Sequence, residues 1–166
     1  MAGLLPLRHL GPVLLERDFD VAFRGTFDFT LDAKNRLTVP ARYRAALADG
    51  VVLALPVDLK PCVCIWHPGD YESYSSRALD QLPPLSPRLG EMERFLYGNS
   101  VEAELDAAGR VIVAPFLSRH AGIEKDVVIV GTGPRLELWS RDRWSQHTPE
   151  LLGEVQEITA SFNDTA

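Results

Sequence analysis

Two aspartate–arginine pairs are the residues whose spacing in this chain is best suited to chemistry. Asp32 and Arg36 lie in the segment LDAKNRL, and Asp106 and Arg110 lie at the same places in LDAAGRV, 74 residues further on. An arginine braced by a carboxylate has lost part of its conformational entropy before it meets a ligand, which suits bidentate recognition of a guanine edge or a phosphate. The same pair can equally serve only to stabilise a turn.

Both segments also have the composition of a tight turn. The side chains of Asp32 and Asp106 can accept hydrogen bonds from backbone N–H groups two residues further on. Asn35 and Gly109 occupy the equivalent position in the two copies, and both residue types tolerate a positive φ. We therefore expect each segment to present its arginine from a closed loop.

The repeat extends into the segments that must hold these loops. Residues 26–28 align with residues 100–102, and Val39 aligns with Val113, at the same displacement of 74. Apolar residues alternate around the first loop, which is typical of strands. Each half is predicted to run as strand, tight turn, strand, short helix, two strands and helix, so internal duplication organises the fold.

Three helices are predicted from their starting signals. The first covers residues 40–47 and ends at Gly50, and the Ser-Pro pair at residues 86–87 begins the second. Thr148 is the predicted N-cap of a carboxyl-terminal helix, with Pro149 at its first helical position. These helices are expected to flank the strands of the two halves.

The carboxyl-terminal helix is predicted to have one apolar stripe, formed by Leu151, Val155, Ile158 and Phe162. Such a stripe can pack against its own domain, which is the more common arrangement, or it can lie at a contact between subunits. The second arrangement is the expectation if the chain assembles into an oligomer.

Charge is distributed unevenly along the chain. The protein has a net charge of −6, yet residues 24–44 contain five basic and two acidic residues. Residues 98–123 contain two basic and three acidic residues, and Ala108 stands where the first half has Lys34. An acidic protein can bind DNA when its basic surface faces the phosphates, so the first half is expected to supply more of the electrostatic attraction.

No pattern in the sequence predicts catalysis, a cofactor or a metal. Cys62 and Cys64 alternate on a predicted strand, too close for an unstrained disulfide and too few for structural zinc unless His67 or another ligand folds back. We predict that both are reduced thiols. Metal-binding histidine spacing, phosphate-binding loops and nucleophile motifs are absent from the sequence.

The apolar segments argue against a membrane or exported protein. The longest of them, such as residues 51–57, are too short to span a bilayer. The leucine-rich start of the chain is interrupted by Arg8 and His9 and has no small-residue cleavage site. We expect a cytoplasmic protein whose partners include neither a membrane nor a small-molecule substrate.

The loops and their flanking segments resemble one protein family, the MraZ family of bacterial transcriptional regulators. The resemblance runs from about Phe23 to Phe162 and is carried by FRGTFDFTLDAKNRLTVPARYRAAL, VEAELDAAGRVIVAPFLSRHAGI and VVIVGTGPRLELWSRDRW. It implies an α+β fold, a tandem pseudo-twofold AbrB-like swapped-hairpin β-barrel with flanking helices. It also implies a cytoplasmic, nucleoid-associated protein that binds double-stranded promoter DNA as a ring homo-oligomer.

The resemblance further implies binding to direct repeats in the promoter of the division and cell-wall gene cluster, usually as a repressor. Carried over by position, it implies that Lys34, Arg36 and Arg110 contact DNA. The loops would then be oriented by Asp32, Asn35, Asp106 and Gly109.

The chain is expected to divide into residues 1–22, an amino-terminal extension; 23–81, the first AbrB-like repeat; 82–97, a proline-rich joint and connecting helix; 98–147, the second repeat; and 148–166, a carboxyl-terminal helix and tail. The extension precedes the usual family start and is either a real arm or a wrongly chosen start. Val21 favours the second reading, because a GUG codon there can initiate translation.

Ala114 replaces a common family proline, although Pro115 can still open the helix.

Two functions from other classes remain open. An AbrB-like antitoxin would bind both DNA and a toxin, and it would have one copy of the loop followed by a disordered amphipathic tail. A hydrolase would use Asp32 and Asp106 as acid and base. The arginine four residues after each aspartate favours the charged carboxylate, which argues against that chemistry.

Overall fold

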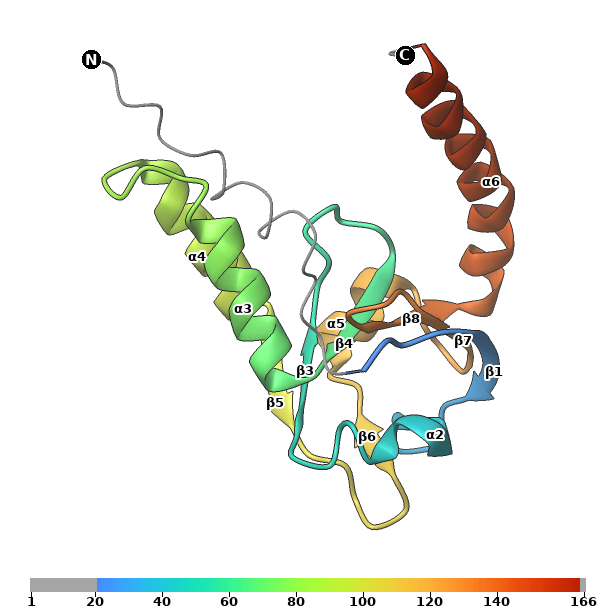
Figure 1. Ribbon diagram of the computed structural model, residues 1–166. Helices are drawn as coiled ribbons and strands as arrows, with labels where there is room; N and C mark the ends of the chain where they lie inside the picture. Colours follow the sequence, from blue (N-terminus) through green and yellow to red (C-terminus); the bar gives the residue numbers. More distant parts are fainter. Residues whose placement is uncertain (1–20, 165–166) are drawn as a thin grey trace, which may run out of the picture.

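A computed structural model of the chain describes residues 21–164 (Figure 1). The first half contains β1 (Thr26–Thr30), β2 (Arg36–Thr38), α2 (Ala41–Arg44), β3 (Val51–Ala54), β4 (Cys62–Trp66) and α3 (Pro68–Leu79). The second contains α4 (Pro87–Gly98), β5 (Ser100–Ala103), β6 (Arg110–Ile112), α5 (Pro115–Ala121), β7 (Asp126–Gly131), β8 (Leu136–Ser140) and α6 (Arg141–Asn163). The predicted order of elements is therefore present in both halves. The predicted amino-terminal extension lies outside the described residues, apart from residues 21 and 22.

The strands form two sheets, and each sheet combines strands from both halves. The larger sheet is antiparallel and has the order β1-β7-β8-β4-β3-β5, so that β1 pairs with β7 and β5 pairs with β3. The smaller sheet pairs β2 with β6. The predicted mixture of helices and strands is confirmed. The predicted barrel is not closed within residues 21–164, because β2 and β6 pair with each other and leave β1 and β5 as open edges.

The hydrophobic core is shared by the two halves. Leu37 of β2 and Val111 of β6 are both buried and belong to one cluster with side chains from the larger sheet. Burying a leucine or valine side chain completely stabilises a fold by about 1.5–3 kcal/mol. The larger sheet contributes Val51, Leu53, Val63, Ile65, Val127, Ile129, Leu136 and Leu138. Because strands of both halves are neighbours in that sheet, these residues are buried only when the halves fold together.

The helix predicted for residues 40–47 is shorter in the structure. Pro40 is its N-cap, and the α-helical part, α2, ends at Arg44. Beyond it, the N–H of Leu47 donates to the carbonyl of Arg44 and that of Ala48 to the carbonyl of Ala45, three residues back in each case. The chain therefore tightens from α-helical to 3₁₀-type hydrogen bonding before it reaches β3.

The equivalent helix of the second half is longer. Ala114 is the N-cap of α5, and Pro115 occupies the first turn as predicted. The helix ends at Gly122, whose φ of 63° gives it the left-handed conformation common after helices. The absence of proline at position 114 therefore leaves the helix intact.

The helix start predicted at Ser86 is confirmed. Its Oγ accepts a hydrogen bond from the N–H of Arg88 (3.2 Å), which satisfies one of the free N–H groups at the start of α4. Leu96 is buried, while Leu89 and Met92 are half-buried. Helices α3 and α4 lie against each other as a hairpin (Figure 1).

The helix start predicted at Thr148 is wrong. Helix α6 begins at Arg141, and Ser140 is its N-cap. Thr148 lies inside the helix, where its hydroxyl donates to the carbonyl of Trp144 at 2.8 Å. Pro149 is also inside the helix, although a proline there removes one backbone hydrogen bond.

Aromatic packing explains why α6 starts about two turns before the cap predicted at Thr148. The ring of Trp139, at the end of β8, lies 5.4 Å from the ring of Trp144 and stacks on the ring of His147 at 4.7 Å between centroids. Contacts of this kind stabilise a pair by about 0.5–1.5 kcal/mol beyond the burial of area. They fix the first turns of α6 against the sheet, so tertiary contacts override the local capping signal.

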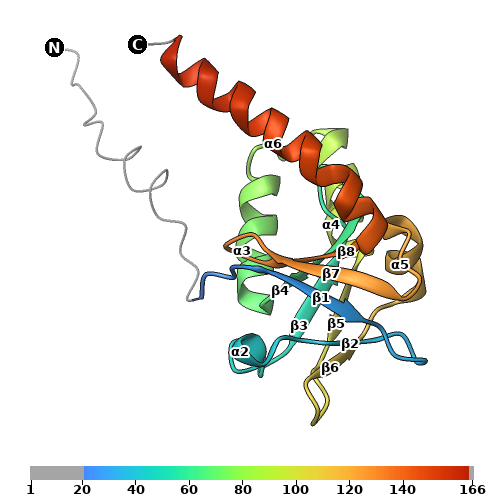
Figure 2. The same ribbon diagram turned by 90° about the vertical axis from the view of Figure 1, so that its right-hand side faces the viewer.

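The rest of α6 extends away from the sheet (Figures 1 and 2). In its apolar stripe, Val155 is 48% exposed, Ile158 is 52% exposed and Leu151 is half-buried. Of the two arrangements left open for the stripe, packing against its own domain is not seen for Val155 and Ile158, because α6 extends away from the sheet. A contact of the stripe between subunits stays a prediction. Within residues 21–164 no helix combines the length and hydrophobicity needed to cross a bilayer.

Candidate nucleic-acid interface

The first loop, residues 31–36, is closed around one carboxylate. Asp32 Oδ1 accepts hydrogen bonds from the N–H of Lys34 (2.9 Å) and of Arg36 (3.0 Å), while its Oδ2 accepts from Arg36 Nε at 2.6 Å. Asn35 has a φ of 56°, which allows the chain to turn between the two amides. The aspartate thus holds both the backbone of the loop and the arginine side chain.

The second loop, residues 105–110, repeats this arrangement. Asp106 Oδ1 accepts from the N–H of Ala108 and of Arg110, both at 2.9 Å, and its Oδ2 accepts from Arg110 Nε at 2.8 Å. Gly109 has a φ of 77° at the position of the asparagine in the first loop. Two sequences that share few residues between the aspartate and the arginine therefore produce the same hydrogen-bonding pattern.

The two strands that flank each predicted tight turn do not pair with each other. The N–H of Asp32 donates to the carbonyl of Arg36 (3.1 Å) and closes the first loop, after which β1 pairs with β7 and β2 pairs with β6. The second loop is closed in the same way. Each loop therefore connects the larger sheet to the two-stranded β2–β6 ribbon.

The ribbon connects the two loops, one at each of its ends, with approximate twofold symmetry. Leu37 is opposite Val111 at its centre, and the N–H of Val39 donates to the carbonyl of Gly109 at 2.9 Å. The symmetric bond, from the N–H of Val113 to the carbonyl of the first loop's asparagine, measures 3.0 Å. The ends of the ribbon are therefore fixed to the loop of the opposite half.

The two ion pairs are also connected across the ribbon. Arg36 Nη1 lies 4.0 Å from Asp106 Oδ2, and the same oxygen accepts from Arg110. The side chains of Arg36 and Arg110 are 25% and 34% exposed. Because each Nε donates to its own aspartate, the terminal Nη groups are the part of each guanidinium suited to a bidentate contact.

Hydrogen bonds keep both loop aspartates ionised. The pKa of Asp32 lies below its usual value of 3.8, chiefly because the N–H of Arg36 donates to the carboxylate. The N–H of Arg110 lowers the pKa of Asp106 in the same way. Neither group is suited to donate a proton near neutral pH, which leaves the hydrolase alternative without support.

The loops should lose stability only in acid. Since the folded loops favour the carboxylates, their contribution is complete above about pH 4 and is lost as the pH falls through the lowered pKa values. Carboxyl NMR titrations of Asp32 and Asp106 are expected to have midpoints below 3.8. Urea denaturation from about pH 6 to about pH 3 should show a smaller acid-dependent loss in the Asp32→Asn/Asp106→Asn variant. Midpoints at or above 3.8 would contradict this account.

Arg44 ties the second loop to the first half of the chain, a role that its sequence position did not indicate. Arg24, Arg42 and Arg44 belong to the basic segment of residues 24–44, and a cation there can simply be solvated on a surface. Arg44 Nε instead donates to the carbonyl of Val39 at 3.0 Å, and its side chain packs over Gly109. No local signal reveals this contact, because it joins residues of the two halves.

Gly109→Ala is expected to destabilise the protein by about 1–3 kcal/mol, since a Cβ would be strained at positive φ and would overlap the Arg44 side chain. Urea denaturation measures this change. Gly153→Ala is the matched control, because the position is inside α6 and has open space around it. That control should be neutral or stabilising by up to about 1 kcal/mol. Equal effects of the two substitutions would contradict the close packing of Arg44 on the second loop.

A different polar cluster lies on the larger sheet. Cys62, Cys64 and Glu137 have their ligating atoms within 4.8 Å of one another, and they are the metal-ligand cluster found among residues 21–164. His67, which sequence reasoning considered as a further ligand, instead caps α3 by accepting from the N–H of Gly69 at 3.1 Å. The carboxylate comes from the other half and was not predicted to be near the thiols.

A duplicated α+β protein that presents two carboxylate-braced arginine loops on a ribbon shared by its halves is the class that this fold and site define. A family model described as "MraZ protein, putative antitoxin-like" matches residues 22–83 and 96–161. The chain belongs to the MraZ family.

Relatives with the name Transcriptional regulator MraZ support this assignment. The protein of Hydrogenovibrio crunogenus is 36% identical over 149 residues, which cover 85% of this chain and 97% of that protein. The protein of Salmonella paratyphi A is 33% identical over 145 residues, with coverages of 86% and 95%, and that of Citrobacter koseri is 32% identical with the same coverages. The match therefore extends over nearly the whole length of these regulators.

Proposed function

We propose that this chain is a sequence-specific DNA-binding transcriptional regulator that acts as a repressor. In this proposal it is a cytoplasmic, nucleoid-associated ring oligomer that binds direct repeats in the promoter of the division and cell-wall gene cluster. The observation that carries the proposal is the β2–β6 ribbon, which sets Arg36 and Arg110 side by side, each braced by its own aspartate. The relatives named as transcriptional regulators support it.

A two-stranded β-ribbon is an element that DNA can accommodate. A B-DNA major groove is about 12 Å wide and admits a two-stranded β-ribbon. With the exposed face of the ribbon against the groove, Arg36 and Arg110 would present Nη groups to guanine edges, and Lys34 at the tip of the first loop would contact phosphate or base. Lys34 is exposed, and its position is taken by Ala108 in the second loop. Binding there would block access of polymerase to the promoter.

The pairing of strands across the halves supports the proposed AbrB-like swapped-hairpin fold. In the larger sheet β1 of the first half pairs with β7 of the second, and β5 of the second half pairs with β3 of the first. The β2–β6 ribbon adds the third exchange. In this proposal each half lends its first strands to the other, which explains why small halves can share a core.

In this proposal the electrostatic attraction of a single subunit to DNA is weak, so tight binding needs several subunits. The chain has a net charge of −6, and the two loops together offer only three basic side chains to DNA. A ring that binds spaced repeats gains affinity through effective concentration. The exposed Val155 and Ile158 of α6 lie on the part of the molecule that extends away from the ribbon, which suits a subunit contact that leaves the loops free (Figures 1 and 2).

A fluorescence titration of the purified oligomer with DNA from upstream of its own gene cluster tests this function. Intact repeats and scrambled repeats should be compared over a salt series. Tight binding that requires the repeats and weakens with salt is expected, because phosphate contacts release counterions. Equal and weak binding to both DNAs by an oligomer whose assembly is verified by light scattering would overturn the proposed function.

The description of the family as antitoxin-like favours one alternative, an antitoxin that binds both DNA and a toxin. The structure has two loop copies, and its carboxyl-terminal part, through residue 163, is the helix α6. Purification of the chain from its native cells separates the two functions. A stoichiometric second protein bound to α6 would support the antitoxin, whereas a homo-oligomer would support the regulator.

A further inference from the structure

The larger sheet brings two thiols and a carboxylate together on the face opposite the main core. Cys62 and Cys64 lie on β4, and Cys64 is directly opposite Glu137 of β8 in the strand register. The two sulfur atoms and a carboxylate oxygen all lie within 4.8 Å of one another. We propose that these three side chains form a binding site for a zinc ion, separate from the loops that are proposed to bind DNA.

The donor set is one that zinc accepts. Zinc binds thiolates at about 2.3 Å and carboxylates at about 2.0–2.2 Å, so the donors of a tetrahedral site lie roughly 3.5–3.8 Å apart. The cluster needs only a small contraction to reach this geometry. Two sulfur donors favour a thiophilic ion such as zinc over magnesium or calcium, which prefer oxygen ligands.

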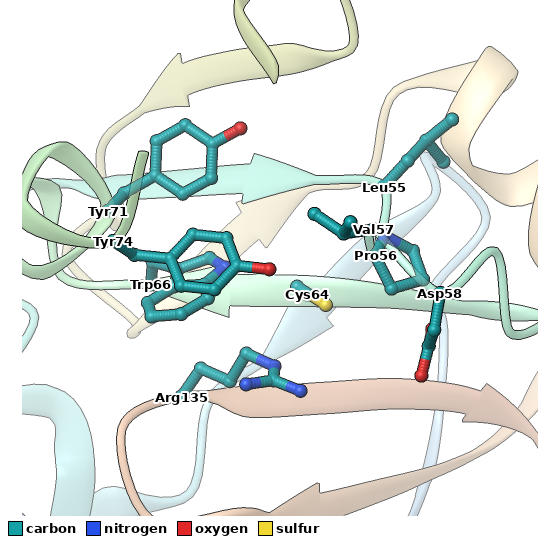
Figure 3. Close-up of a pocket in the computed structure, with 9 residues that line it drawn as sticks. All are labelled: Leu55, Pro56, Val57, Asp58, Cys64, Trp66, Tyr71, Tyr74 and Arg135. Atoms are coloured by element: carbon teal, nitrogen blue, oxygen red, sulfur yellow. The ribbon is translucent and has the colours of Figure 1, made fainter. Parts of the chain in front are cut away.

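A pocket gives the site both an access route and a fourth ligand position. A cavity of about 240 Å³ is lined by Cys64 together with Trp66, Tyr74 and Arg135. Figure 3 shows the Cys64 sulfur inside this pocket, between the Tyr74 hydroxyl and the Arg135 guanidinium. A water molecule or a small anionic ligand in the pocket would complete four-coordination, as at zinc sites with three protein ligands.

Charge balance at the cluster fits a divalent ion. Two thiolates and the Glu137 carboxylate carry three negative charges, which zinc and the Arg135 guanidinium together neutralise. Arg135 Nη2 donates to Glu137 Oε2 at 3.0 Å. Zinc bound there would therefore leave no buried net charge at the cluster.

Neighbouring groups are placed to orient the ligands. Glu137 Oε1 accepts a hydrogen bond from Trp139 Nε1 at 3.1 Å, so the carboxylate is held from both sides. Among residues 21–164 the buried Arg135 Nε has no hydrogen-bond partner. A thiolate at Cys64 would supply an acceptor for it, and outer hydrogen bonds of this kind commonly strengthen metal sites by about 10–100-fold. Two neutral thiols buried in a core would require no charged carboxylate or guanidinium beside them.

The test uses the full-length, tag-free protein after removal of metal with a chelator. Titration with Co²⁺ should give one equivalent per chain and a near-ultraviolet band from thiolate-to-cobalt charge transfer, which Zn²⁺ should displace. Cys64→Ser should abolish stoichiometric uptake, and Glu137→Gln should weaken it more than about tenfold. Glu157→Gln, an exposed glutamate of α6, is the matched control and should bind as the unmodified chain does.

Protection of the cysteine thiols from alkylation tests the proposal on the unmodified chain, even if a variant fails to fold. In the unmodified chain, Zn²⁺ should slow alkylation of Cys62 and Cys64 and raise the melting temperature. Absence of stoichiometric uptake, unchanged alkylation, or uptake that persists in a folded Cys64→Ser variant would each overturn the proposal. These readouts do not depend on DNA, so the zinc site and the regulator function stand or fall separately.

Discussion

Arg36→Ala should weaken binding to the operator by about 1–3 kcal/mol for each engaged site and reduce the preference for intact over scrambled repeats. Arg36 is held by Asp32 and lies near Asp106, so its guanidinium has a fixed orientation. In the proposed function, its loss removes a contact that reads bases as well as a charge. Fluorescence anisotropy with both DNAs, at one salt concentration and at matched oligomeric state, measures the two effects.

Three further variants separate charge from recognition. Arg36→Lys keeps the charge but loses the planar fork, so selectivity should fall more than non-specific affinity. Lys34→Ala should chiefly reduce the slope of log affinity against log salt, by about one for a single phosphate contact. Arg119→Ala, at an exposed position of α5, serves as the control for the loss of a surface cation. If Arg36→Ala retains full affinity and selectivity, the residue does not read the operator.

Val155→Glu/Ile158→Glu should separate the subunits and lower operator affinity by about 10²–10⁴-fold, because the avidity of a multivalent complex would be lost. Both side chains are about half exposed on the part of α6 that leaves the sheet, so the charges should disturb an intermolecular contact and not the core. Light scattering reports the assembly, and anisotropy with repeat DNA reports the affinity.

The control for this helix variant is Gln156→Glu, which adds one negative charge to α6 outside the apolar stripe. It should leave the oligomer intact. The melting temperature of the double variant should stay close to that of a separated wild-type subunit. An intact oligomer with unchanged affinity in the double variant would remove the proposed role of α6 in assembly.

Features that depend on neighbouring residues could be predicted from the sequence. Each loop begins with an aspartate and has Asn35 or Gly109 near its end, and these residue types predict a tight turn from local sequence alone. The backbone has a positive φ at both Asn35 and Gly109. The order of elements follows from the duplication, since two similar sequences fold into similar segments. The start of α4 also depends on a local cap, and Ser86 provides it.

Features that depend on distant residues could not be predicted. The ion pair between Arg36 and Asp106 and the packing of Arg44 on Gly109 arise only after β2 and β6 pair. Strand pairing between halves depends on burial across the whole sheet. The alternation of apolar residues along one strand shows only which side chains share a face of that strand. The start of α6 was misplaced for the same reason, because Trp139 stabilises its first turns from the preceding strand.

The ribbon that joins the loops is built from one polypeptide, which has a consequence for evolution. Two identical chains forming such a ribbon would carry identical loops, and every substitution would change both sides at once. Here Lys34 and Ala108 already differ at equivalent positions. Mutation can therefore change one loop while the other keeps its sequence. If the loops bind DNA as proposed, two copies in one chain can form a directional reader of sites arranged head to tail, where two identical chains would form a symmetric reader of palindromes.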